Sequence, residues 1–479
     1  MEIITQLKKT IVKLIEENKY EEACLLVKKA AAIDMEWDAE MYYFAAIVIE
    51  YEGLYALSIA YIKQAIILEP DNSIFKEYYD GISFGKVQWN DILDIAEVRK
   101  NKKRILLVEG VFDTLDLFTD EFVNTFEYLG YECCVHNYKK EDSYAKMISF
   151  ISKARVDFVF FFNNTGLGID APMNKKIVSI LKCTKINILV DHPAFTLKAV
   201  KEYLQNNDFV ECVVDRDHVK YLDEYKGIVT RNRFIPHGGK ALNIEIKPLS
   251  QRKIGVLYVG STKKYPKLPD ELNEKCLEEM ILNPNMSSIE AIKKVVMEEY
   301  SIEESDVDLL PNDVFEVLHQ NEWVALGFYR TETIKALVES GIKVNVYGLG
   351  WDQVDFANNP NLIIGDLLTP FECIEKMYDS VIVLNSMPWF KDGTHERIFN
   401  AMLAGSIVVT DKSKWLEENF IDGENIISFD LKKIDKMVNR VEKIIANVDE
   451  YQSIADEGYK TAVARHTWSH RALEVINMM

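Results

Sequence analysis

The spacing of apolar residues divides the chain into a helical first part and a longer part in which apolar runs and helical patterns alternate. Over the first ninety or so residues, apolar and polar positions follow a helical period, glycines are few, and no strand pattern is present. Farther along, short runs rich in Val, Ile and Phe alternate with helical patterns. This alternation predicts parallel sheets with helices on both faces.

Two segments of the helical part resemble each other at a fixed offset. When Asn18–Trp37 is aligned with Gly53–Asn72, Tyr20 falls on Tyr55, Ala23 on Ser58, and Ala30 on Ala65. The offset is close to the roughly 34 residues of a tetratricopeptide repeat. Residues 1–90 therefore resemble a small all-α, tetratricopeptide-like domain, with a plain helical hairpin as the alternative. Two repeats seldom stand alone, so we expect the segment to pack on the rest of the chain or to form a homodimer.

The alternating part predicts two α/β domains, after a linker near Gly81–Lys103. The first domain spans residues 100–245, and its run Val156–Asn164 is apolar on both faces, as a central parallel strand is. The second spans residues 250–479 and is interrupted by a charged, helical insertion at residues 263–320. Further strand candidates are Lys103–Gly110, Tyr131–Tyr138, Ile186–Pro193, Phe209–Asp217, Lys253–Thr262, Val344–Trp351, Leu362–Leu367, Val381–Ser386 and Ser406–Asp411.

Charge and cysteine content exclude several classes of protein. The net charge is −20, from 56 basic and 76 acidic residues without a basic patch, so we expect no nucleic-acid partner. The seven cysteines show no C-x-x-C spacing, which favours reduced thiols and a cytoplasmic location. The first residues lack the apolar core and cleavage site of a secretion signal. The most apolar run, Phe158–Phe162, is too short for a membrane span.

Candidate chemistry gathers where the strands end, because ligands of open α/β sheets bind beyond the carboxyl ends of the strands. In the second domain the turn after Tyr258 and the turns at later strand ends could bind a phosphate through backbone N–H groups. No G-x-G-x-x-G opens a helix there, so a dinucleotide fingerprint is absent. The strand-end candidates are Asp191, His192, Asp217 and His237 in the first domain, and Gly260, Ser261, Tyr347, Gly348 and Asn385 in the second.

The segment Lys391–Asp411 combines several features of an anion-binding helix. We predict Thr394 as the N-cap of a helix that begins at His395 and stops before Gly405. The first turn of such a helix presents unpaired N–H groups and a partial positive charge. Arg397 could add a guanidinium for a diphosphate. An ordinary capped helix with polar surface residues is the alternative.

This segment resembles a known family. Val381–Asp430 is similar to the donor-binding half of GT-B glycosyltransferases, and within these to the spore-maturation (CgeB-type) proteins with their N-E-R-x-F-E-A-x-A-x-G signature. The likeness covers about a hundred C-terminal residues, and the first domain matches more loosely, mainly in architecture and in the strand-end groups DHP and IPHGG. It implies two Rossmann-like domains facing a cleft, so the expected fold is α/β and GT-B-like, preceded by the helical domain.

The resemblance also implies roles for individual residues. Asp392 occupies the place of the first glutamate of an E-x7-E signature, before Gly393 and Thr394, and would accept hydrogen bonds from sugar hydroxyls. Asn400 replaces the second glutamate, which holds the nucleotide ribose in that family, and an amide is a weaker acceptor than a carboxylate. Glu396 and Arg397, after His395, match the narrower E-R pair, and Arg397 would face the diphosphate.

The activity implied is sugar transfer from a nucleotide-sugar donor without an obligatory metal or cofactor. The expected acceptor is a protein, such as flagellin or another surface protein, recruited by the helical domain. An inverting enzyme would need a general base from Asp191, His192, Asp217 or His237. Three alternatives remain: a catalytically degenerate scaffold, a sugar-nucleotide epimerase, and a GT-A enzyme that holds manganese through Asp215 and Asp217.

Overall fold

The protein is described from a computed structural model over residues 2–31, 37–51, 55–81, 103–153, 156–171, 175–195, 208–224, 231–262, 271–307, 317–318 and 320–477. The predicted linker near Gly81–Lys103 and parts of the predicted insertion lie outside these residues. The chain forms two compact units. The first contains Met1–Leu106, Asp120–Val135 and Lys146–Asp157, and the second contains Leu107–Thr119, His136–Ala145 and Phe158–Met479. The predicted domain boundaries stay a prediction.

The N-terminal part is helical, as predicted. Its helices are α1 (Glu2–Glu16), α2 (Tyr20–Ala31), α3 (Ala39–Tyr51), α4 (Tyr55–Leu68) and α5 (Ser73–Gly81). Small buried residues such as Ala23, Ala45 and Ala46 let these helices approach closely. The hydroxyl of Ser58 donates to the carbonyl of Ala46 at 2.7 Å, which joins α4 to α3. The assignment to tetratricopeptide repeats stays a prediction.

A six-stranded sheet follows in the order β2-β1-β3-β6-β7-β8. Its strands are β1 (Arg104–Glu109), β2 (Glu132–Asn137), β3 (Phe158–Phe162), β6 (Thr184–Leu189), β7 (Phe209–Val213) and β8 (Arg231–Phe234). β3 is buried along its whole length and pairs in parallel with β6, as its apolar run predicted. The helices that connect these strands are α6 (Asp113–Tyr128), α7 (Ser143–Lys153), α8 (Ile177–Ile180) and α10 (Arg216–Glu224). A short hairpin of β4 (Asp170–Ala171) and β5 (Lys175–Lys176) was not predicted.

The second sheet has the order β11-β10-β9-β12-β13-β14, with parallel pairing throughout. Its strands are β9 (Ile254–Val259), β10 (Val344–Tyr347), β11 (Leu362–Gly365), β12 (Ser380–Asn385), β13 (Ile407–Asp411) and β14 (Ile427–Phe429). The predicted strands are all present, and the three-residue β14 was missed because so short a run has no clear period. Since β9 lies between β10 and β12, its carboxyl end is a topological switch point, where ligands bind.

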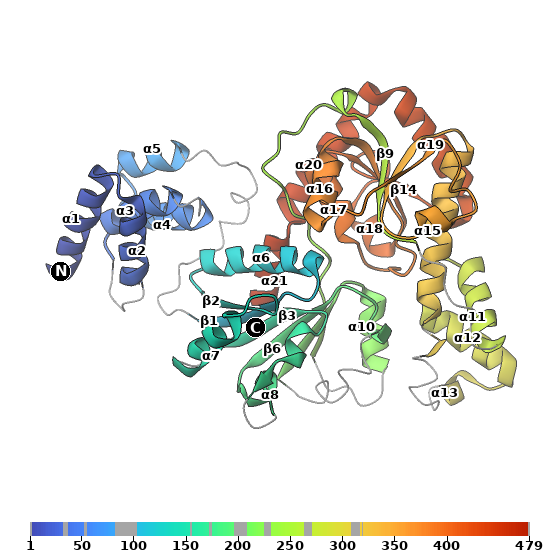
Figure 1. Cartoon of the computed structure of the whole chain (residues 1–479), viewed down its shortest axis with the longest axis horizontal. Helices are drawn as coiled ribbons and strands as arrows, with labels where there is room; N and C mark the ends of the chain where they lie inside the picture. Colours follow the sequence, from blue (N-terminus) through green and yellow to red (C-terminus); the bar gives the residue numbers. More distant parts are fainter. Residues whose placement is uncertain are drawn as a thin grey trace. The chain divides into compact units, whose positions relative to one another are not determined.

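Helices cover both faces of the second sheet (Figure 1). One layer consists of α16 (Pro370–Tyr378), α17 (Glu396–Leu403) and α20 (Gln452–Arg465), and the other contains α15 (Asn321–Glu339) and α19 (Ile434–Ala446). The shorter α18 (Lys414–Asn419) follows β13. Two Rossmann-like parallel sheets preceded by a helical region confirm the predicted fold class.

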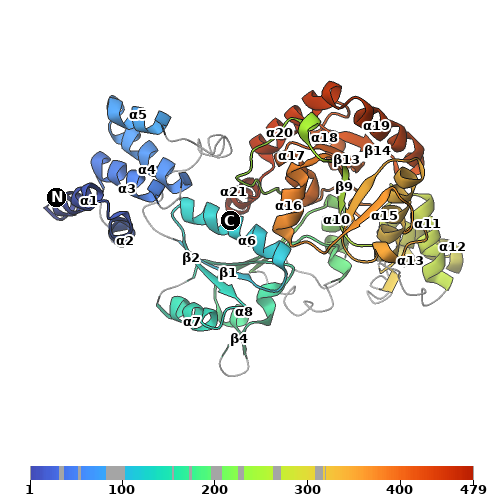
Figure 2. The same cartoon turned by 45° about the horizontal axis from the view of Figure 1, so that its top comes forward.

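The insertion forms a small helical layer beside α15 (Figure 2). It contains α11 (Glu271–Leu282), α12 (Ser288–Tyr300) and α13 (Glu304–Val307), which share a core that includes Cys276, Ile292 and Val307. Tyr329 on α15 donates its hydroxyl proton to the carbonyl of Ile281 on α11 at 2.5 Å. The insertion therefore packs on the same helix that covers the second sheet.

The last helix, α21 (Trp468–Asn477), returns to residues of the first sheet. The ring of Trp468 lies 4.2 Å from that of Phe118 and 5.8 Å from that of Phe162, measured between centroids. The backbones of Gly239 and His466 are joined by a 2.8 Å hydrogen bond. These contacts tie the C-terminal segment to α6, to β3 and to the chain that follows β8. Over the described part of the chain, no helix has the length and apolar character needed to cross a membrane.

Candidate functional site

Two neighbouring cavities open within the second unit. The first, the glycine-turn cavity, has a volume of about 220 Å³ and is lined by the turns at Gly260 and Gly348, together with Arg397 and Asn400. The second, the aromatic cavity, has a volume of about 240 Å³ and is lined by Phe112, Trp389, Phe390, Asp191 and other residues. Thr114, Phe118 and Glu396 line both cavities, so Glu396 lies on their common wall.

The glycine-turn cavity lies at the carboxyl ends of β9 and β10, as the switch point predicts. A Cβ atom on Gly348 would lie 2.5 Å from the carbonyl carbon and oxygen of Gly260, so these two turns touch directly. Gly348 has a φ of 145°, a conformation that favours glycine. Because the turns are closed by hydrogen bonds such as Gly260 N–H to Tyr347 O at 2.8 Å, their backbone is held rigidly beside the cavity.

Arg397 brings a buried positive charge to this cavity from the first turn of α17. Its Nη1 donates to the amide oxygen of Asn385 at 2.6 Å, and the amide of Asn385 donates to the hydroxyl of Thr410 at 2.9 Å. The guanidinium lies 5.3 Å from the ring centre of Tyr258. Burial lowers the pKa of Arg397, but an arginine stays charged at neutral pH. Asn385 thus positions Arg397 from outside the cavity lining.

The start of α17 differs from the prediction. The helix begins at Glu396 and its N-cap is His395, not Thr394. The hydroxyl of Thr394 instead accepts from the backbone N–H of His237 at 3.0 Å, and Thr394 is fully buried. Thr394 was a plausible cap by residue type, but its oxygen is used by a residue 157 positions away.

His395 and Glu396 form a close pair on the wall of the aromatic cavity. Nδ1 of His395 lies 2.8 Å from a carboxylate oxygen of Glu396 and 3.2 Å from the backbone nitrogen of Arg397. A protonated Nδ1 donates to the carboxylate, whereas an unprotonated Nδ1 accepts from the N–H group, so the tautomer decides between the two. Despite burial, the neighbouring imidazole holds the pKa of Glu396 well below its usual value, so Glu396 is a carboxylate.

Two of the four predicted bases lie in the aromatic cavity. The carboxylate of Asp191 accepts from the amide of Asn163 at 2.8 Å, and burial raises its pKa, with the charge of Glu396 adding to the effect. His237 also lines the cavity, but burial lowers its pKa to about 3, so it is neutral. Its Nε2 lies 3.9 Å from Glu396. Asp191 therefore has the pKa of a better base than an ordinary aspartate.

The other two predicted bases lie outside both cavities. His192 is buried in a ring cluster, with its centroid 4.4 Å from that of His218 and 5.2 Å from that of Tyr221. Asp217 is in the first turn of α10, where its carboxylate pairs with Lys220 at 2.7 Å. Both residues follow strands, which suggested a site. In the structure, His192 packs among neighbouring rings and Asp217 pairs with a lysine of its own helix.

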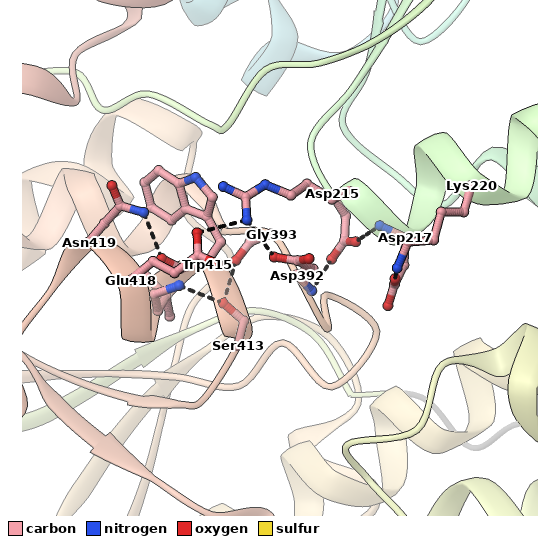
Figure 3. Close-up of polar contacts among 11 residues, drawn as sticks. Asp215, Asp217, Lys220, Asp392, Gly393, Ser413, Trp415, Glu418 and Asn419 are labelled. Atoms are coloured by element: carbon pink, nitrogen blue, oxygen red, sulfur yellow. Dashed lines mark hydrogen bonds and ion pairs between the residues drawn. The ribbon is translucent and has the colours of Figure 1, made fainter.

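Asp392 was expected to bind the sugar, but it joins the two sheets instead (Figure 3). Its backbone N–H donates to Asp215 at 2.9 Å, and its carboxylate lies 3.3 Å from Arg216. The other oxygen of Asp215 accepts from the backbone of Asp217 at 2.6 Å. Neither Asp392 nor Gly393 lines either cavity. Because backbone amides occupy both oxygens of Asp215, this geometry does not favour a metal-binding Asp-x-Asp.

Gly393 lies beside the contact between Asp392 and Asp215, which we call the Asp215 junction. Its position forms an antiparallel bridge with Asp215, and an added Cβ would lie 2.4 Å from the carbonyl oxygen of Val214. Its own carbonyl accepts from the hydroxyl of Ser413 at 2.7 Å. The backbone of Gly393 therefore lies between residues that follow β7 and residues that follow β13.

Asn400 and Arg330 complete the site. The side-chain oxygen of Asn400 accepts from the backbone N–H of Lys240 at 2.8 Å, so the amide that replaces the family's second glutamate already holds the chain between the two sheets. Arg330 on α15 was not predicted from the sequence. Its guanidinium donates to the carbonyl of Ser261 at 3.1 Å, and its charge acts on both Asp191 and Arg397. A lone arginine inside a helical pattern carries no sequence signal of such a role.

Within the ranges that the structure describes, no group of three or more His, Cys, Asp or Glu side chains is arranged to hold a metal ion. The positive groups near the cavities are arginine side chains and the first turn of α17.

Comparison with known proteins gives a partial match. Residues 330–477 match a family described as "Glycosyl transferase-like". No curated protein matches the chain.

Three solved structures are similar in outline. Sucrose-phosphate synthase from Thermosynechococcus elongatus is 11% identical, with a TM-score of 0.47 over 79% of this chain and 98% of its own. Anabaena HepE in complex with UDP-glucose is 11% identical, with a TM-score of 0.45 over 78% and 100%. A glycosyltransferase from Rickettsia africae is 11% identical, with a TM-score of 0.44 over 79% and 98%. Identity this low identifies neither ligand nor substrate.

Proposed function

We propose that this protein is a glycosyltransferase of the GT-B type that moves a sugar from a nucleotide-sugar donor to an acceptor hydroxyl. The observation that carries the proposal is the pairing of two cavities across Glu396, one with Arg397 and two glycine turns, the other with a carboxylate of raised pKa. The match of residues 330–477 to a glycosyltransferase-like family supports it, since these residues include Arg397 and the turn at Gly348.

The donor diphosphate binds at the glycine-turn cavity in this proposal. Arg397 and the first turn of α17 supply positive charge where the leaving diphosphate gains negative charge. Arg330, anchored on the carbonyl of Ser261, adds a second positive group near the same turn. Asn400 lines the cavity and contacts the nucleotide ribose through its remaining amide protons, since its oxygen is held by Lys240.

Transfer then follows a balanced displacement at the anomeric carbon. The acceptor oxygen forms a bond to that carbon while the bond from the carbon to the diphosphate oxygen breaks, and the electron pair leaves with the diphosphate. The acceptor proton passes to Asp191, the predicted base whose position and raised pKa both suit the role. This route inverts the anomeric configuration. Arg397 neutralises the leaving group, so the route includes no metal.

The family likeness extends the proposal to the acceptor. The resemblance to spore-maturation proteins, together with a helical N-terminal region, favours a protein acceptor such as flagellin or another surface protein, modified in the cytoplasm. The helices α1 to α5 would recruit that protein, and they would also be the site of a homodimer if one forms.

A scaffold without catalysis is the second candidate, and the occupied oxygen of Asn400 favours it. Hydrolysis of a panel of sugar nucleotides, including UDP-glucose, separates the two. An enzyme releases nucleoside diphosphate slowly without an acceptor, and Arg397→Ala lowers this release about 100-fold to 1,000-fold. A scaffold releases none, and a thermal-shift screen then shows no stabilisation by any nucleoside diphosphate. An epimerase would isomerise or hydrolyse the donor at full rate with no acceptor present.

A further inference from the structure

We propose that the aromatic cavity is a saccharide subsite, so that the hydroxyl that receives the sugar belongs to a pyranose ring of the acceptor. This inference rests on the proposed function, since an acceptor ring here would lie beside the donor cavity, across Glu396. It goes further by naming the chemical class of the acceptor, whether that ring is free or already attached to a protein.

The lining of the cavity matches the two kinds of surface on a pyranose. Such a ring has apolar C–H faces with slightly positive hydrogens, and a rim of hydroxyl groups. Aromatic faces carry negative charge density and attract such hydrogens. Four aromatic side chains, Phe112, Phe118, Trp389 and Phe390, line the cavity. They provide the apolar walls that a bare serine or threonine side chain would leave uncovered.

The polar side of the cavity suits neutral hydroxyl groups. The amide oxygen of Asn163 accepts from the backbone N–H of Val190 at 2.9 Å, and its NH₂ group donates to Asp191 at 2.8 Å. Asn163 therefore fixes the carboxylate of Asp191 through one oxygen, and the other oxygen accepts no hydrogen bond from the residues that the structure describes. With the carboxylate of Glu396 on the same wall, the cavity repels anionic acceptors and favours hydroxyl donors.

Trp389 is held in place by aromatic packing behind the cavity. Its ring centre lies 4.8 Å from that of Trp323, in an edge-to-face arrangement, and 5.7 Å from that of Phe195. Trp323 belongs to α15, the helix on which the insertion packs. A wall fixed before binding loses little entropy when a ligand binds, so it favours a specific ring orientation. This gives α15 a part in acceptor recognition.

Phe112 lies at the mouth of the cavity. It belongs to the turn between β1 and α6, it is 54% exposed, and its neighbour Val111 is 46% exposed. Apolar side chains that lie exposed together at the rim of a cavity commonly mark a binding site. A bound pyranose would cover Phe112 from one side, with Trp389 on the wall of the cavity.

The test measures glycoside binding without relying on transfer. Saturation-transfer difference NMR is recorded on the full chain with methyl glucoside, methyl galactoside and methyl N-acetylglucosaminide, beside the variants Phe112→Ala and Trp389→Phe. We expect saturation of ring C–H protons in the wild type, and about threefold to tenfold weaker binding when Phe112 is removed. Phe328→Ala, which removes an exposed phenylalanine outside both cavities, should bind like the wild type. Since Phe112 is exposed, its removal should not prevent folding.

The outcomes separate this inference from the proposed function. If the wild type hydrolyses a sugar nucleotide but saturates no glycoside, the saccharide subsite is wrong and the transferase remains. Equal saturation in the wild type and in Phe112→Ala also overturns it. The saccharide subsite is also wrong if Phe112→Ala raises the KM for donor hydrolysis and leaves glycoside binding unchanged, because the aromatic cavity would then hold the donor. The wild type could also bind a glycoside, lose that binding in Phe112→Ala, and hydrolyse no sugar nucleotide. That result would reject the transferase activity and leave the saccharide subsite in place.

Discussion

Nη1 of Arg397 donates to the side-chain oxygen of Asn385 at 2.6 Å, although the two residues come from different elements, the first turn of α17 and the end of β12. The bond fixes a buried guanidinium on the wall of the glycine-turn cavity. Since Asn385 is itself held by Thr410, the orientation of Arg397 is determined by the ends of two neighbouring strands.

We therefore expect Arg397→Ala to lower kcat for sugar-nucleotide turnover about 100-fold to 1,000-fold, because the leaving diphosphate loses a preorganised donor. Asn385→Ala should lower it less, since the guanidinium remains but is less well oriented. Steady-state release of nucleoside diphosphate measures both effects. Arg440→Ala is the control, because Arg440 forms a surface pair with Asp422 and lines neither cavity. Equal turnover in wild type and Arg397→Ala would remove the diphosphate assignment.

Asp191→Asn should lower kcat for transfer by about 100-fold to 10,000-fold, because the acceptor proton loses its base. Nucleotide binding should stay unchanged, since Asp191 lies outside the glycine-turn cavity. Transfer by the wild type should fall as pH drops through the raised pKa of Asp191. Glu396→Gln removes a like charge and should move this fall to lower pH. If transfer by Glu396→Gln falls at the same pH as transfer by the wild type, the assignment of Asp191 as the base is contradicted.

Gly348→Ala should weaken transfer roughly 100-fold, because its Cβ would meet the backbone of Gly260 and displace both turns from the phosphates. Nucleotide affinity from calorimetry and transfer rates measure the effect. Gly341→Ala separates the effect of backbone strain from that of a steric clash, since Gly341 also has a positive φ but has open space around it. That control should lose about 1 kcal/mol of stability and keep its nucleotide affinity. Similar losses of affinity in both variants would contradict the steric explanation.

The Asp215 junction gives a prediction for stability. Burial raises the pKa of Asp215 to about 7, above the value of roughly 4 in an unfolded chain. Between these two pKa values the folded state holds a proton that the unfolded state releases. The contribution of Asp215 to the free energy of unfolding therefore falls as pH rises from about 4 to about 7. Asp215→Asn should be about 1–3 kcal/mol less stable at pH 5, because one backbone N–H loses its acceptor.

The deficit of Asp215→Asn relative to wild type should shrink as pH rises toward 8, and urea unfolding at both pH values measures it. Asp435→Asn, on the exposed side of α19, should stay within about 0.5 kcal/mol of wild type at each pH. A constant deficit for Asp215→Asn across the window would show that Asp215 does not hold its proton in the folded state.

Removal of metal ions with a chelator tests whether Arg397 neutralises the charge of the leaving diphosphate. In our mechanism the leaving diphosphate is neutralised by protein groups, so transfer should persist after dialysis against EDTA and should not increase when manganese is returned. Loss of activity with EDTA, restored by manganese, would instead favour a metal-dependent route. Arg397→Ala measured under both conditions shows whether an added cation can replace the guanidinium.

Much of the fold could be predicted from the sequence because its signals are local. A strand buried on both faces, such as β3, reads as a continuous apolar run, and a helix such as α17 ends where glycine takes a left-handed conformation. The positions of strand ends then predict where ligands bind. The missed strands β8 and β14 and the short hairpin are too brief to show a period.

The sequence by itself therefore determined the two parallel sheets, the helical first part, and the turns and arginine that surround one cavity. Only the tertiary structure decided which strand-end groups share a cavity. Thr394 caps no helix because His237 uses its oxygen, and Asp392 pairs with residues that follow β7, 177 positions from its hydrogen-bond partner. The physical reason is that a side chain's partners depend on contacts between elements far apart in the chain, whereas hydrophobic periodicity depends only on near neighbours.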